Sequence, residues 1–112
     1  MRIKFVDLKS TTMLNTLKKI LGLGPQVNYK ELIAKGAQII DVRTPGEFKN
    51  GHTHGAINVP LQSISHEIGK LNKEKTYITC CASGMRSRQA KNFLISKGFE
   101  HVHNGGSWAS LT

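Results

Sequence analysis

The feature that most constrains the fold is an apolar run that ends in two cysteines and leads directly into a glycine-containing loop and a helical pattern. Residues 75–80 (KTYITC) predict a buried strand, residues 81–86 (CASGMR) a tight loop, and residues 87–97 a helix. Apolar strand-like and helical segments alternate along the rest of the chain as well. Such alternation predicts an α/β fold in which a mostly parallel sheet carries helices on both faces.

The remaining elements follow from capping and breaking signals. Asn28 and Glu31 have the spacing of a capping box, and Thr44-Pro45 places proline at the first position of a helix. A short amphipathic helix is expected at 12–21, so we assign residues 1–26 to an N-terminal arm with this helix and residues 27–112 to the domain. The other expected elements are helices at 28–35 and 63–71 and strands at 37–42, 56–59 and 101–103.

Length and charge limit the classes of function. The 112 residues are enough for one compact domain. The formal charge of +9 favours small anionic ligands, but the lysines are scattered without interleaved aromatic residues, which predicts no nucleic-acid partner. No apolar stretch is long enough for a membrane span, and adjacent cysteines form a poor disulfide, so we expect a soluble cytoplasmic protein.

No metal or other cofactor is predicted. The histidine pairs at 52/54 and 101/103 bring no cysteine ligands at usable spacing, and the two cysteines do not form a C-x2-C pair.

The cysteine loop carries the chemistry. A loop between a strand and a helix aims its backbone N–H groups at one point, which stabilises a thiolate at its base. Gly84 suits unusual backbone angles, Ser83 offers a hydroxyl, and Arg86 supplies positive charge for an anionic substrate. Counted from Cys80 the spacing is C-x5-R, that of a tyrosine phosphatase loop, whereas from Cys81 it is C-x4-R. The residues alone do not decide whether Cys80 or Cys81 is the nucleophile.

An ordered set of motifs resembles the single-domain rhodanese (thiosulfate sulfurtransferase) family over about residues 27–110. The resemblance implies the rhodanese-like three-layer fold, with Cys81 carrying sulfur as a persulfide and Cys80 ending the strand. It also implies substrate binding by the loop residues Ala82, Ser83, Gly84, Met85 and Arg86, and support from Asp41 and Arg43. The motifs are DVRTPGEF (41–48), GH (51–52), GAINVP (55–60), CASGMRS (81–87) and GG (105–106).

The expected activity is therefore that of a thiosulfate sulfurtransferase with a small anionic sulfur donor and an acceptor such as cyanide, a thiol or a protein. Two alternatives stay open: a cysteine-dependent phosphatase or arsenate-reductase-like enzyme that uses Cys80, and a non-catalytic rhodanese module. We also expect Arg43 and Glu47, four residues apart, to form an ion pair.

Overall fold

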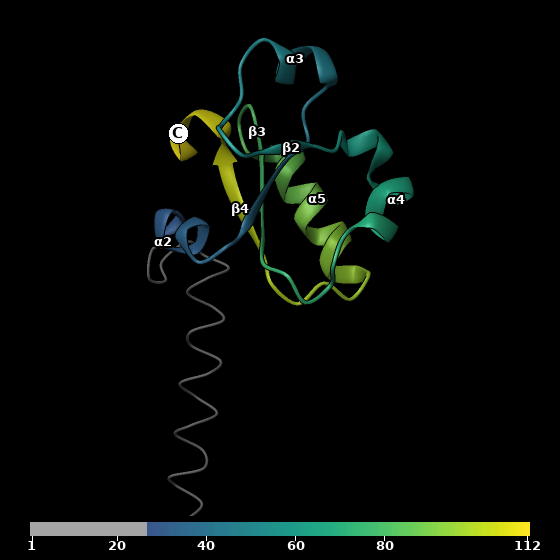
Figure 1. Ribbon diagram of the computed structural model, residues 1–112. Coiled ribbons are helices and arrows are strands. Elements are labelled where there is room, and N and C mark those ends of the chain that lie inside the picture. Colours follow the sequence, from purple (N-terminus) through teal and green to yellow (C-terminus); the bar gives the residue numbers. More distant parts are fainter. Residues whose placement is uncertain (1–26) are drawn as a thin grey trace, which may run out of the picture.

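A four-stranded parallel sheet organises the computed structural model, which describes residues 27–112 (Figure 1). The strand order is β2-β1-β3-β4, and every neighbouring pair is parallel, which confirms the predicted sheet. The strands are β1 (Gln38–Asp41), β2 (Ile57–Asn58), β3 (Tyr77–Cys81) and β4 (Val102–Ser107). The helix expected at 12–21 lies outside the described residues, and the domain boundary near residue 26 stays a prediction.

Helices cover both faces of the sheet, as expected for a three-layer α/β fold (Figure 1). Helices α4 and α5 pack on one face, whereas α2 and the C-terminal 3-10 turn η3 pack on the other. The α-helices are α2 (Tyr29–Ala34), α3 (Pro45–Lys49), α4 (Ile64–Glu67) and α5 (Met85–Ser96), and the 3-10 turns are η1 (Leu61–Ser63), η2 (Ile68–Lys70) and η3 (Trp108–Leu111).

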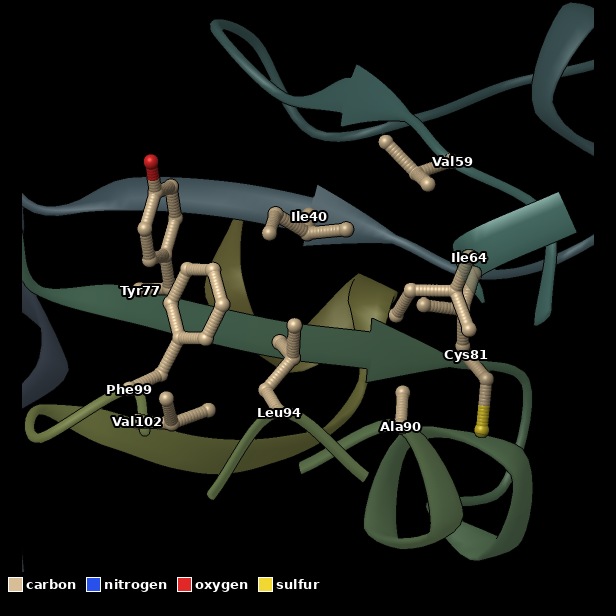
Figure 2. Packing of buried hydrophobic residues seen from close by; sticks show 10 residues of the cluster. Ile40, Val59, Ile64, Tyr77, Cys81, Ala90, Leu94, Phe99 and Val102 are labelled. Atoms are coloured by element: carbon tan, nitrogen blue, oxygen red, sulfur yellow. The ribbon is translucent and has the colours of Figure 1, made fainter. Parts of the chain in front are cut away.

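Each face of the sheet has its own apolar cluster. The larger cluster lies under α4 and α5, and it includes Ile40, Leu94 and Cys81 (Figure 2). The smaller cluster lies under α2 and η3 and contains Ile39, Ile78 and Cys80. Because successive side chains of a strand point to opposite faces, the two neighbouring cysteines belong to different clusters.

The two predicted helix starts, at Asn28 and at Thr44-Pro45, are present. The Asn28 side chain accepts a hydrogen bond from the Glu31 N–H at the start of α2. At the start of α3, Thr44 and Glu47 form a complete capping box, and Pro45 occupies the first helical position. The helix expected at 63–71 is instead divided into η1, α4 and η2, with Gly69, a poor helix former, in the last turn.

Three element boundaries near the cysteines differ from the prediction. Strand β3 extends through Cys81 rather than ending at Cys80, and α5 begins at Met85 rather than at Ser87. Strand β4 (Val102–Ser107) continues through the glycine pair, beyond the expected strand at 101–103. The reason is close packing: a Cβ atom on Gly105 would lie 2.8 Å from Ile78 Cγ2 and 3.0 Å from Leu111 Cδ1, so the strand requires glycine there.

Candidate active site

The Cys81 sulfur lies at the carboxyl end of β3, beside α5 (Figure 2). Only Ala82, Ser83 and Gly84 separate the strand from the helix, and Gly84 makes this turn with a φ of 103°. The Gly84 N–H donates to Cys81 Sγ at 2.9 Å, and the Ser87 N–H donates at 3.4 Å. First-turn N–H groups have no acceptor within their own helix, so the sulfur satisfies them.

These hydrogen bonds change the acidity of the thiol. Burial raises the pKa of Cys81, but hydrogen bonding with the Ser87 hydroxyl and hydrogen bonds from the N–H groups of Ser87, Gly84 and Ser83 lower it further than burial raises it. The net result is a Cys81 pKa below its ordinary value. The arrangement therefore favours a thiolate, the form of cysteine that acts as a nucleophile.

Two residues at this site were missed by the sequence prediction. The Ser87 hydroxyl lies 3.4 Å from Cys81 Sγ and donates to Asn104 Oδ1 at 2.6 Å. Asn104 comes from β4 and also donates from Nδ2 to the Gly84 carbonyl at 3.2 Å. The position of Ser87 in the first turn of the helix was a usable signal, because that turn faces the sulfur. Asn104 gave no local signal beyond being a polar residue next to the glycine pair.

The predicted loop residues occupy different positions around the sulfur. The side chains of Ala82, Ser83 and Met85 are exposed at the rim, and Gly84 is partly buried. The Arg86 guanidinium makes two hydrogen bonds to the Glu47 carboxylate, at 2.7 and 3.0 Å. The Arg86 hydrogen bonds, followed by the Thr44 backbone N–H, lower the Glu47 pKa to about 2, so this carboxylate stays charged at neutral pH.

Asp41 and Arg43 form a buried ion pair beneath the loop region. Arg43 Nη2 lies 2.7 Å from Asp41 Oδ2 and also donates to the Gly51 carbonyl at 2.7 Å. The guanidinium stacks over Trp108, 4.6 Å from the ring centroid. The expected pairing of Arg43 with Glu47 is wrong, because α3 begins only after Arg43 and the two side chains do not share a helical face.

Cys80 has the opposite surroundings. Its side chain packs with Ile39 and Ile78 under α2. Burial and the nearby negative charge of Asp41 raise the pKa of Cys80 to about 12. A thiol of this kind stays protonated at neutral pH and faces away from the loop that holds the Cys81 sulfur.

Within residues 27–112, no three His, Cys, Asp or Glu side chains come together as a metal site would require. Over the same range, no helix has the length and apolar character needed to cross a membrane.

His52 stacks on Phe48 with ring centroids 3.7 Å apart, and its Nδ1 contacts the Phe48 carbonyl at 2.8 Å.

The fold and the loop define a class of protein. Residues 25–109 match the family described as the rhodanese-like domain, and the chain belongs to this family. The predicted rhodanese fold is thereby confirmed, since solved rhodanese structures also superpose on this chain. One of them, a rhodanese with anions from Escherichia coli, has a TM-score of 0.61 and 37% sequence identity, and the match covers 65% of this chain and 89% of that one.

Two curated relatives of similar sequence are named thiosulfate sulfurtransferases. Thiosulfate sulfurtransferase PspE of Escherichia coli is 39% identical over 69 residues, which cover 60% of this chain and 66% of PspE. Thiosulfate sulfurtransferase GlpE of Shewanella oneidensis is 34% identical over 71 residues, which cover 63% of this chain and 70% of GlpE.

Proposed function

We propose that the protein is a sulfurtransferase that moves sulfane sulfur from a donor such as thiosulfate to a thiophilic acceptor through a Cys81 persulfide. The observation that carries the proposal is the set of N–H donors on Cys81 Sγ, with the Gly84 N–H at 2.9 Å. The names of the relatives, thiosulfate sulfurtransferases of similar sequence, support a sulfurtransferase activity in general.

In the first half-reaction, the Cys81 thiolate attacks the outer sulfur of thiosulfate. A new S–S bond forms to Cys81, the S–S bond of thiosulfate breaks, and sulfite leaves with the electron pair of that bond. The lowered pKa of Cys81 increases the fraction of thiolate available for this attack. The product is Cys81–S–S⁻, and its negative charge takes the place of the thiolate charge within the loop.

In the second half-reaction, an acceptor removes the outer sulfur. Cyanide attacks this sulfur, thiocyanate leaves, and the Cys81 thiolate is restored; a thiol or a protein thiol would act in the same way. The N–H groups of the loop and of the first turn of α5, including those of Gly84 and Ser87, stabilise the anionic sulfur as an oxyanion hole stabilises oxygen. A reducing compartment such as the cytoplasm would keep Cys81 available for this cycle.

Arg86 and Glu47 limit how much positive charge the loop presents. Each side chain of the pair is 36% exposed, so both lie at the rim of the loop. Because Glu47 neutralises Arg86, attraction of an anionic donor depends mainly on the backbone N–H groups and on the overall charge of +9. This arrangement suits a small anion that enters and leaves readily.

The phosphatase alternative requires Cys80 as the nucleophile. That thiol packs with Ile39 and Ile78 on the other face of the sheet, and its pKa is raised to about 12. Both properties oppose nucleophilic attack from the longer C-x5-R frame. The non-catalytic alternative is decided by whether the protein takes up sulfur at all.

The deciding experiment is intact mass spectrometry after incubation with thiosulfate. We expect one added sulfur, about 32 Da, that disappears when cyanide is added. Cys81→Ser should take up no sulfur, whereas Cys80→Ser should be loaded as the wild type is. Loading that depends on Cys80, or none in the folded wild-type protein with any sulfane donor, would overturn the proposal.

A further inference from the structure

The Ser87 hydroxyl stands between two groups that compete for its single proton. Its oxygen is 3.4 Å from Cys81 Sγ and 2.6 Å from Asn104 Oδ1. A hydroxyl has one hydrogen to donate, so it serves either the sulfur or the amide oxygen at a given moment. In the arrangement observed, it donates to Asn104 and accepts from the Cys81 thiol.

The amide of Asn104 is fixed in an orientation that aims its oxygen at Ser87. Oδ1 also accepts from the Gly106 N–H at 2.9 Å, and Nδ2 donates to the Gly84 carbonyl at 3.2 Å. Rotating the amide by half a turn would set Nδ2 against an N–H donor and Oδ1 against a carbonyl. The backbone is held too, since the Asn104 carbonyl accepts from the Tyr29 hydroxyl at 2.8 Å.

The fold explains how a residue of β4 reaches this place. Thr79 pairs with Asn104 and Cys81 pairs with Ser107, so two steps along β3 are matched by three steps along β4. This irregularity in register occurs beside the sulfur, where such bulges redirect a side chain. Asn104 thus links α2, the cysteine loop and the first turn of α5.

We propose that Asn104 is a positioning residue that holds the Ser87 hydroxyl away from the sulfur until Cys81 loses its proton. When the thiol proton passes to solvent, the hydroxyl turns toward the thiolate, and Asn104 Oδ1 keeps only its bond from Gly106. Asn104 therefore stabilises the thiol form and moderates how readily the nucleophile forms. The inference rests on the proposed role of Cys81 but deepens it, because it names the residue that tunes this thiol.

Other charged or titratable groups surround the site, and the test must separate them from Asn104. They are Tyr29 of α2, Asp41 of β1, Arg43 in the segment after β1, Glu47 of α3, Cys80 of β3, Arg86 of α5 and His103 of β4. Asp41 pairs with Arg43 and Glu47 pairs with Arg86, so substitution of Asn104 leaves both ion pairs in place.

The test measures ionisation of Cys81 directly, in a Cys80→Ala background of the full chain. The readouts are the rate of alkylation by iodoacetamide as a function of pH and the ultraviolet absorbance of the thiolate. Asn104→Leu, similar in shape but without an acceptor, should raise the acid dissociation constant of Cys81 about fivefold. This factor corresponds to the free energy of about one neutral hydrogen bond. Asn104→Asp, a stronger and charged acceptor, should lower this constant about tenfold.

Coupling to Ser87 distinguishes the proposal from a merely structural role. Ser87→Ala should lower the dissociation constant, and in that background Asn104→Leu should have no further effect, because the hydroxyl that it releases is gone. If Asn104 only supports the structure of the cysteine loop, both Asn104 variants should displace the backbone N–H groups from Cys81 Sγ. Both should then lower the acid dissociation constant of Cys81. That result, or an Asn104→Leu effect that persists with Ser87→Ala, would overturn the proposal.

Asn58 provides a matched control. It is a partly buried asparagine of β2 whose Nδ2 donates to the carbonyls of Asp41 and Arg43 at 2.9 Å each, away from Ser87. Asn58→Leu should leave the dissociation constant of Cys81 unchanged. If Asn104→Leu fails to fold by circular dichroism, Asn104→Ala replaces it with the same expected direction. Because alkylation needs no sulfur donor, this test can fail or succeed independently of persulfide formation.

Discussion

Two adjacent cysteines on β3 occupy opposite faces of the sheet and have opposite acid–base properties. Burial does not separate them, since Cys80 is 0% and Cys81 1% exposed. Their surroundings differ: the Cys81 sulfur receives N–H groups from the start of α5, whereas Cys80 lies among isoleucines and near the negative charge of Asp41. Burial raises the pKa of both thiols, and the hydrogen-bond donors on one strand face reverse this effect for Cys81 alone.

The charged pairs near the two cysteines follow the same division. The Asp41–Arg43 pair, beside Cys80 in the sheet, is nearly inaccessible, with side chains 0% and 6% exposed. The Glu47–Arg86 pair, beside the Cys81 loop, is 36% exposed on both sides. We interpret the first pair as part of the framework and the second as part of the rim of the site.

The largest expected effect is the difference in alkylation between the two thiols. At pH 8, a thiol with a pKa of about 12 is ionised to about one part in ten thousand. We expect iodoacetamide to modify Cys81 in the Cys80→Ala variant at least about a thousandfold faster than Cys80 in the Cys81→Ala variant. Mass spectrometry over time measures both rates, and equal rates in folded protein would remove the basis of the comparison.

Removal of the framework arginine should have the next largest effect. Arg43→Ala leaves the buried Asp41 carboxylate without its partner, which typically costs about 3–5 kcal/mol of stability. Urea unfolding measures this loss, and Arg88→Ala, at an exposed position on α5, is a control for loss of an arginine. We expect the pH dependence of Cys81 alkylation to stay where it is. If the pH dependence of Cys81 alkylation shifts strongly in folded Arg43→Ala, Arg43 is part of the active site instead.

Close packing of β4 on the Cys80 face leads to a smaller effect. The Cβ atom in Gly105→Ala would lie 2.8 Å from Ile78 Cγ2 and 3.2 Å from the Thr79 carbonyl, so we expect a loss of about 1–3 kcal/mol. Gly69→Ala is the control, since no atom lies within 4 Å of its added Cβ. Thermal unfolding of the two variants compares them. If Gly105→Ala is as stable as Gly69→Ala, the strand has room that the structure does not indicate.

Much of the fold was predictable because its signals are local. The caps at Asn28 and Thr44 and the apolar strand at 75–80 depend on residues within a few positions of one another. The choice between Cys80 and Cys81 was less local. It depended on family resemblance, because the spacing to Arg86 fits two kinds of loop. The alternation of β3 side chains makes the distinction only once the faces of the sheet are known.

The contacts around the sulfur were not predictable in the same way. Ser87 and Asn104 are 17 positions apart and meet only because of the irregular register between β3 and β4. The error over Glu47 has a similar origin. A spacing of four favours pairing only within one helix, and the partner of Glu47 is Arg86, 39 positions away, across the loop.

The smallest expected effect concerns the rim. Glu47→Gln removes the charge that neutralises Arg86, so we expect the KM for thiosulfate to fall by about threefold through stronger attraction of the anion. Glu67→Gln is the matched control, because Glu67 is also 36% exposed and pairs with Lys70. Steady-state assays should show the decrease in KM for Glu47→Gln alone. An equal decrease in both variants would mean that overall charge, rather than Arg86, attracts the donor.

The stability difference between the wild type and Glu47→Gln should depend on pH. The folded-state pKa of Glu47, about 2, lies below its ordinary value of 4.5, so its pairing stabilises the fold above about pH 4.5 and this contribution is lost as the pH falls toward 2. The Tm of the wild type should exceed that of Glu47→Gln at pH 6, and the two should converge in acid. A constant difference would show that this stability does not depend on the charge of Glu47, and therefore not on its ion pair with Arg86.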